Sequence, residues 1–147
     1  MRLVAFYIKK NSLPYIFGDE SIEGYNENPR TINLGGEYLY GFKEEPDKKI
    51  RITQTKNKQF IPNFWKENED DKLSLVSAIV GTNGIGKTSI LRYLNSNGLD
   101  PLYTDCIRIF ENKGQIIVYK DDLDDYEIKA LDDFEFELRD KSNIGER

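Results

Sequence analysis

Alternating apolar and polar residues dominate the first part of the chain and predict β-strands. Arg2 to Lys9 is rich in β-branched and aromatic residues, and Lys49 to Thr55 alternates cleanly. Glu37 to Phe42 alternates in the same way, and Thr31 to Leu34 allows a short strand within a loop-like stretch. We therefore expect a β-rich region before residue 73, with Gln59 to Phe64 as a further edge strand interrupted by Pro62.

A different pattern occupies the middle of the chain. Leu73 to Val80 is an apolar run of strand length, and Ile90 to Asn95 places apolar residues at helical spacing. Gly98 fits the cap of that helix. Strand, glycine-rich loop and helix follow one another over residues 73–95.

The last third returns to strand patterns. Cys106 to Glu111 and Gln115 to Lys120 flank a turn that contains Gly114, which predicts a β-hairpin over residues 104–120. Asp132 to Leu138 alternates apolar and acidic residues like an exposed strand, although its composition also allows a helix.

The loop between the central strand and helix is a complete G-x-x-x-x-G-K-[ST] sequence. Its flanking strand and helix are the context that such a phosphate-binding loop requires. We expect the following residues to bind a nucleotide: Gly81, Thr82, Asn83, Gly84, Ile85, Gly86, Lys87, Thr88 and Ser89.

Each residue type in this loop has a chemical reason to be there. The glycines let backbone N–H groups converge on phosphate oxygens, and the helix start adds the positive end of its dipole. Lys87 can reach the β- and γ-phosphates, and the Thr88 hydroxyl can bind Mg²⁺. Ser89 can donate to the α-phosphate. The expected cofactors are ATP and Mg²⁺.

Composition limits which other kinds of site and which cellular settings the chain suits. The 147 residues suit one domain, and the lack of histidine excludes histidine catalysis and histidine metal ligands within this chain. Cys106 is the single cysteine, so we expect a buried thiol and a reducing, cytoplasmic setting. No apolar run reaches the length of a membrane span.

Charge is distributed unevenly along the chain. Residues 121–147 hold eleven acidic and four basic residues, a net charge of −7, whereas residues 1–120 carry +2. The sum is the chain's −5. DNA binding is possible but is not indicated by charge, and the acidic C-terminal segment reads as a solvated face.

The residues from Val76 to Leu94 resemble the phosphate-binding loop of ABC-type ATPase heads, in particular through Asn83 and Gly84. That family includes the SMC-like, RecF-like and OLD-like repair and phage-defence ATPases. The resemblance implies an α/β P-loop fold, present here as the N-terminal lobe with a β-rich segment before the loop. It also implies ATP hydrolysis across a head-to-head dimer, and a base-contacting surface for which the candidates are Phe42, Phe60, Phe64 and Trp65.

Several family elements are missing from the chain. No apolar strand ends in Asp-Glu, the signature motif is absent, and Gln115, at the start of a predicted strand, is a poor match for the family's Q-loop glutamine. We therefore expect no catalytic residue here, and hydrolysis only if a missing lobe or partner subunit supplies it. The alternatives are a non-hydrolysing nucleotide-sensing module or split subunit that docks on a partner and, less in keeping with the β-rich N-terminus, a small-molecule or nucleoside kinase.

Overall fold

The computed structural model describes residues 1–9, 30–62, 64, 76–78, 88, 90, 91, 94 and 105–140. These residues form eight β-strands and no complete helix. The strands are β1 (Arg2–Ile8), β2 (Arg30–Asn33), β3 (Tyr38–Glu45), β4 (Lys49–Lys56), β5 (Cys106–Asn112), β6 (Gln115–Asp121), β7 (Glu127–Ala130) and β8 (Glu137–Asp140).

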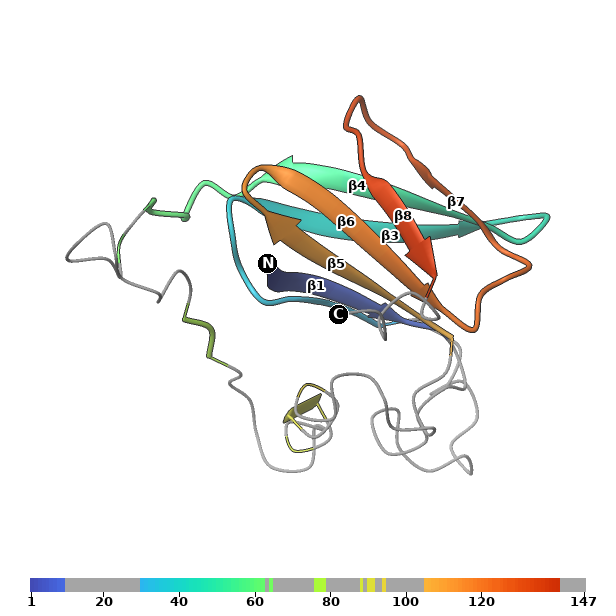
Figure 1. The fold of residues 1–147 in the computed structure, drawn as a ribbon, viewed down its shortest axis with the longest axis horizontal. Coiled ribbons are helices and arrows are strands. Elements are labelled where there is room, and N and C mark those ends of the chain that lie inside the picture. The colour runs from blue at the N-terminus through green and yellow to red at the C-terminus, as the bar shows by residue number, and fades with distance from the viewer. Residues whose placement is uncertain are drawn as a thin grey trace.

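The strands build two mixed sheets, a five-stranded sheet in the order β2-β1-β5-β6-β8 and a three-stranded sheet in the order β3-β4-β7 (Figure 1). Most neighbours are antiparallel, but β7 runs parallel to β4 and β8 parallel to β6. The expectation of an α/β P-loop fold is therefore wrong: the described chain is a mostly β protein. The local strand-loop-helix pattern did not reveal that sheets from outside residues 73–95 build the core.

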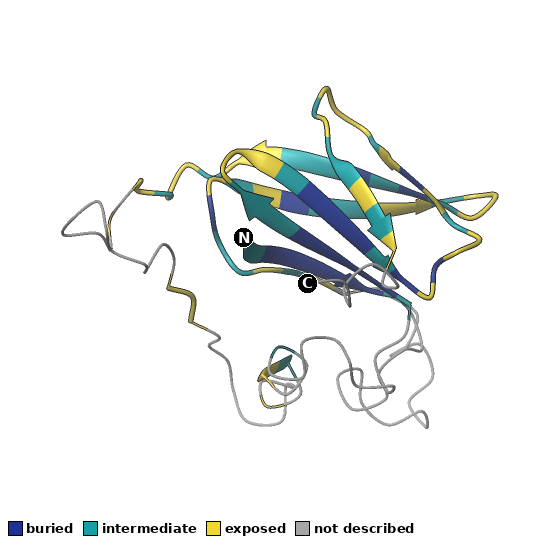
Figure 2. Cartoon of the chain, viewed as in Figure 1, coloured by how far each residue is buried: buried dark blue, intermediate teal, exposed yellow. Residues whose placement is uncertain are grey.

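The two sheets pack face to face, and their inner faces supply the main core. Tyr7, Ile107 and Ile109 from the five-stranded sheet meet Ile50 and Ile52 from the three-stranded sheet, and all five are 0% exposed. Figure 2 shows the buried stretches of the strands in dark blue. Alternation along each strand sends these residues inward, as expected for a two-layer β fold.

Several predicted strands are confirmed. β1 and β4 begin where the predicted strands begin, and β2 and β3 lie within a few residues of the expected ranges. The β5–β6 hairpin is also confirmed, with Lys113 and Gly114 at φ values of 49° and 85° in its turn. Positive φ at both positions matches the twist of a tight hairpin, and glycine adopts it without strain.

One strand prediction is wrong, and a second is confirmed only in part. The described residues of Gln59 to Phe64 form turns in place of a hairpin partner for β4, whose second neighbour is β7. In the stretch from Asp132, only Glu137 and Leu138 enter a strand, β8. At the edge of β4 for which the local pattern predicted residues 59–64, the partner is β7, a parallel strand from later in the chain. β8 likewise pairs in parallel with β6.

β2 also reaches the other sheet through one side chain. The Asn33 amide donates to the Tyr40 carbonyl oxygen at 2.9 Å, and the Tyr40 N–H donates to the Asn33 side-chain oxygen at 2.7 Å. These two bonds tie the end of β2 to the free side of β3. Both sheets are therefore fixed at the end of the sandwich where β1 and β3 begin.

Candidate functional site

Of the nine residues predicted to bind nucleotide, the structure describes only Thr88, which has helical backbone and is exposed. The other eight, from Gly81 to Lys87 and Ser89, lie outside the described residues. The geometry that bears on the site is therefore that of the segments on either side of the loop.

The segment before the loop meets the end of β2. The Ser77 hydroxyl donates to the Leu34 carbonyl oxygen, and the Leu34 N–H donates to the Val4 carbonyl oxygen at 2.8 Å. Residues 76–78 are exposed and belong to no strand, so these three do not show the buried strand predicted over Leu73 to Val80. A side-chain bond, rather than a backbone ladder, holds Ser77 at the sheet.

The segment after the loop packs on the outer face of the five-stranded sheet. Ile90 and Leu94 contact the buried cluster made by Phe6, Ile8 and Cys106. Residues four apart share one face of a helix, so Ile90 and Leu94 point to the sheet, whereas Thr88 and Leu91 are exposed. The amphipathic character predicted for Ile90 to Asn95 is thus found in its described residues.

Both flanking segments reach the same part of the molecule. Leu34, which accepts the Ser77 bond, also packs with Ile32 against the cluster that contacts Ile90 and Leu94. The two ends of the loop-bearing segment are consequently held beside β1 and β2. A loop anchored on both sides loses less conformational entropy when it closes around a ligand.

A buried ion pair lies on the same outer face. The Arg108 guanidinium contacts the Asp121 carboxylate at 2.8 Å, and the two side chains are 6% and 1% exposed. The Cys106 thiol lies 3.3 Å from the same carboxylate. Cys106 is buried, as predicted, but it contacts a charged group as well as apolar neighbours.

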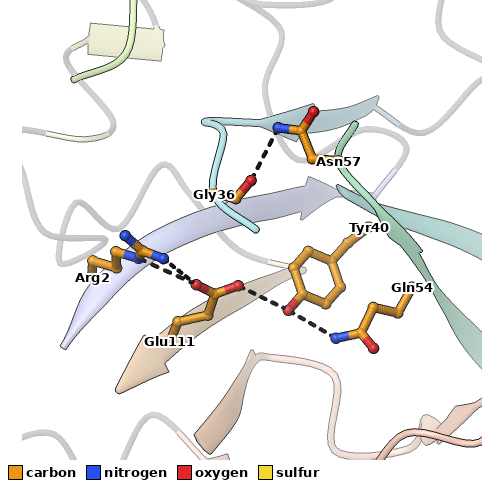
Figure 3. Close-up of polar contacts among 6 residues, drawn as sticks. All are labelled: Arg2, Gly36, Tyr40, Gln54, Asn57 and Glu111. Atoms are coloured by element: carbon orange, nitrogen blue, oxygen red, sulfur yellow. Dashed lines mark hydrogen bonds and ion pairs between the residues drawn. The ribbon is translucent and has the colours of Figure 1, made fainter. Parts of the chain in front are cut away.

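A polar network joins the two sheets where β1 and β3 begin (Figure 3). The Arg2 guanidinium donates to Glu111 at 2.7 Å, and the other Glu111 oxygen accepts from the Tyr40 hydroxyl at 3.4 Å. Gln54 in turn donates to Tyr40 at 3.3 Å. Burial is the main reason that the Tyr40 pKa lies well above its usual range, which keeps its hydroxyl protonated and able to donate.

The loop between β2 and β3 is built into this end of the sandwich. Gly36 has a φ of 124°, and a Cβ at that position would lie 3.3 Å from the Val4 side chain and 3.7 Å from Glu111. The Asn57 amide donates to the Gly36 carbonyl oxygen at 3.0 Å (Figure 3). Only glycine combines this backbone conformation with so close an approach.

The four aromatic residues proposed to contact the base have different positions. Phe42 stacks on Tyr7 with ring centroids 4.9 Å apart between the sheets, so it is a core residue. Phe60 lies beside Arg2, whose guanidinium carbon is 5.8 Å from the ring centroid, and Phe64 is 60% exposed. Trp65 lies outside the described residues.

The acidic candidates for hydrolysis do not converge. Among the described residues, no group of three or more acidic or cysteine side chains is arranged to hold a metal ion. Asp132 accepts a bond from the Gln54 N–H, and Gln115 donates to Glu137 at 2.8 Å on the exposed surface.

Sequence reasoning missed both polar groups. Arg2 and Glu111 are 109 positions apart, and nothing local to either residue indicates their pairing. Arg108 did carry a signal, because it alternates with Ile107 and Ile109 on a strand whose two faces are buried. A charged residue inside such a run requires a partner.

No helix within the described ranges is long and apolar enough to cross a membrane. Comparison of the chain with protein-family models, with curated proteins and with solved structures gave no match.

Proposed function

We propose that the chain binds a nucleoside triphosphate with Mg²⁺ through Gly81 to Ser89. The observation that carries the proposal is the complete phosphate-binding sequence, followed by a segment that packs Ile90 and Leu94 on the sheet and leaves Thr88 exposed. In this arrangement the Thr88 hydroxyl is accessible to a metal ion, and Lys87 supplies the positive charge for the β- and γ-phosphates.

The resemblance of residues 76–94 to ABC-type heads supports ATP as the nucleotide and a role in DNA repair or phage defence. It also supports a complete protein in which a further lobe or partner subunit brings the hydrolytic groups and two heads meet across the nucleotide. This chain contributes phosphate and metal contacts to that reaction, which depends largely on positioning and charge stabilisation.

The decisive experiment compares nucleotide binding by the wild-type chain and Lys87→Ala, using a fluorescent ATP analogue with Mg²⁺. Removing a charged hydrogen bond worth about 1.5–3 kcal/mol weakens binding about 10- to 100-fold. Lys43→Ala, which removes an exposed lysine of β3 far from the loop in sequence, is the matched control and leaves the affinity unchanged. Equal binding by wild type and Lys87→Ala, or no binding by wild type, refutes the proposal.

A second candidate is a sensing module that binds ATP without cleaving it. The lack of any convergent acidic group in the described ranges favours this role. Measuring phosphate release separates the sensing role from the ATPase role. The sensing role requires stable ATP binding without phosphate release, both by the chain alone and after each candidate partner is added.

A further inference from the structure

Exposed apolar side chains gather at one end of the sandwich. We call this the apolar end: it comprises the starts of β1 and β3, the end of β4 and residues 57–62 and 64 beyond it. The large apolar residues exposed there or directly beside it are Met1 at 55%, Leu39 at 38%, Ile61 at 60%, Phe64 at 60% and Val76 at 48%. A concentration of this kind on a folded protein marks an interaction surface.

The segment beyond β4 presents this apolar surface. The Asn57 N–H donates to the Glu37 carbonyl oxygen, the Phe60 N–H donates to the Asn57 carbonyl oxygen, and the Phe64 N–H donates to the Ile61 carbonyl oxygen. These turns project residues 57–62 and 64 away from the end of β4, as the green segment to the left of β4 shows in Figure 1. Hydrogen-bonded turns therefore hold Ile61 and Phe64 in exposed positions.

The same end carries exposed charges of both signs. Lys56 and Lys58 are exposed at the end of β4, and Asp133 and Glu135 are exposed on the connection between β7 and β8. That connection lies beside the end of β4, because the Gln54 N–H donates to Asp132 at 3.2 Å. Within the described residues, none of the four exposed charges takes part in an ion pair.

The opposite end of the sandwich differs in both respects. On its turns Lys48 pairs with Asp125 at 2.7 Å. The other exposed charges on these turns, which form no ion pair among the described residues, are all acidic: Asp47, Asp122 and Asp124. The Lys9 ammonium donates to the Tyr126 hydroxyl, and the Tyr7 hydroxyl donates to Glu44. None of the exposed large apolar residues of the described chain lies on the turns at this end, residues 46–48 and 122–126.

We propose that two copies of this chain associate through their apolar ends about a two-fold axis. In such a pair the same surface serves both copies, so Lys56 and Lys58 of each face Asp133 and Glu135 of the other, and Ile61 and Phe64 are buried between them. A surface that holds apolar groups together with unmatched charges of both signs complements itself. This contact is separate from the nucleotide loop and requires no nucleotide.

The test measures the dissociation constant of the dimer by sedimentation without nucleotide. Lys56→Glu with Lys58→Glu makes both charged contacts repulsive and raises the constant about tenfold or more, and so does Asp133→Lys with Glu135→Lys. An equimolar mixture of the two double variants restores dimers, because each charge-reversed segment then meets its complement. Circular dichroism confirms that each variant is folded.

Two further variants make the outcome decisive. Ile61→Ser with Phe64→Ser also dissociates the dimer, by removing the apolar contact rather than the charges. Asp124→Lys, an exposed reversal at the opposite end, leaves the constant unchanged. A wild-type chain that stays monomeric at every concentration, or a mixture that fails to restore dimers, overturns the proposal without affecting the nucleotide-binding test.

Discussion

The two faces of the five-stranded sheet are both buried but are built differently. The inner face buries only uncharged side chains where Tyr7, Ile107 and Ile109 meet the second sheet, and the Tyr7 hydroxyl donates to Glu44 at its end. The outer face combines Phe6, Ile8 and Cys106 with the Arg108–Asp121 pair, and residues of the loop-bearing segment contact it. The inner face can serve stability alone, whereas the outer face joins the sandwich to the segment that we propose to bind nucleotide.

The buried ion pair gives the largest test of this difference. Replacing Asp121 alone by Leu leaves the Arg108 charge buried without its carboxylate and lowers the free energy of unfolding by about 3–5 kcal/mol. Replacing both, as in Arg108→Met with Asp121→Leu, recovers most of that loss because no isolated charge remains. Urea denaturation measures both variants, and a double variant as unstable as the single one contradicts this account.

Truncation of one apolar residue on each face gives the next effect. Ile109→Ala on the inner face, where the side chain is 0% exposed, costs about 2–5 kcal/mol in urea denaturation. Leu94→Ala on the outer face costs less, since that side chain is only partly buried, but it weakens nucleotide binding by disturbing the anchored segment. Equal effects of the two variants on nucleotide affinity, at a temperature where both are folded, contradict the division between the faces.

The smallest expected effect is on the pH dependence of stability. Three exposed carboxyl groups have lowered pKa values, and in each case a hydrogen bond from a basic side chain is the main cause. The pairs are Asp125 with Lys48, Glu127 with Lys129 and Glu137 with Arg139. A carboxyl whose pKa is lower in the folded state stabilises the fold above its unfolded pKa, and this contribution disappears as the pH falls through the folded pKa. Asp105 acts in the opposite sense, because burial raises its pKa.

Melting temperatures should therefore fall modestly between about pH 5 and pH 2. The three pairs are exposed, so about 1 M salt should remove most of their share of the fall. A fall of the same size in high salt would show that other groups, on the buried faces, control the acid response.

Local pattern was sufficient for elements whose partners are close in sequence. β-Branched and aromatic composition located β1, alternation located β4, and Gly114 located the β5–β6 turn. β7 was missed because only Ile128 of its four residues is buried, and its parallel pairing with β4 spans more than 70 residues. Non-local pairing of this kind leaves no periodic signal in a short strand.

The site divides in the same way. The phosphate-binding loop could be predicted from the sequence because the residues that would contact phosphate are nine consecutive positions. The network of Arg2, Glu111, Tyr40 and Gln54 draws single residues from four strands, and only the assembled sheets bring them together. The motif also suggested an α/β fold that the described strands do not form, since nine residues of loop chemistry do not determine sheet topology.

The bond pair between Asn33 and Tyr40 has a consequence for association with other chains. A β-strand edge with free N–H and C=O groups invites a foreign strand to pair with it. The Asn33 side-chain amide forms hydrogen bonds with both the N–H and the C=O of Tyr40. These are the two backbone groups that a strand from another chain would otherwise pair with. The edge of β3 is thereby closed at this position to fibril-like stacking, which directs self-association toward side-chain contacts at the apolar end.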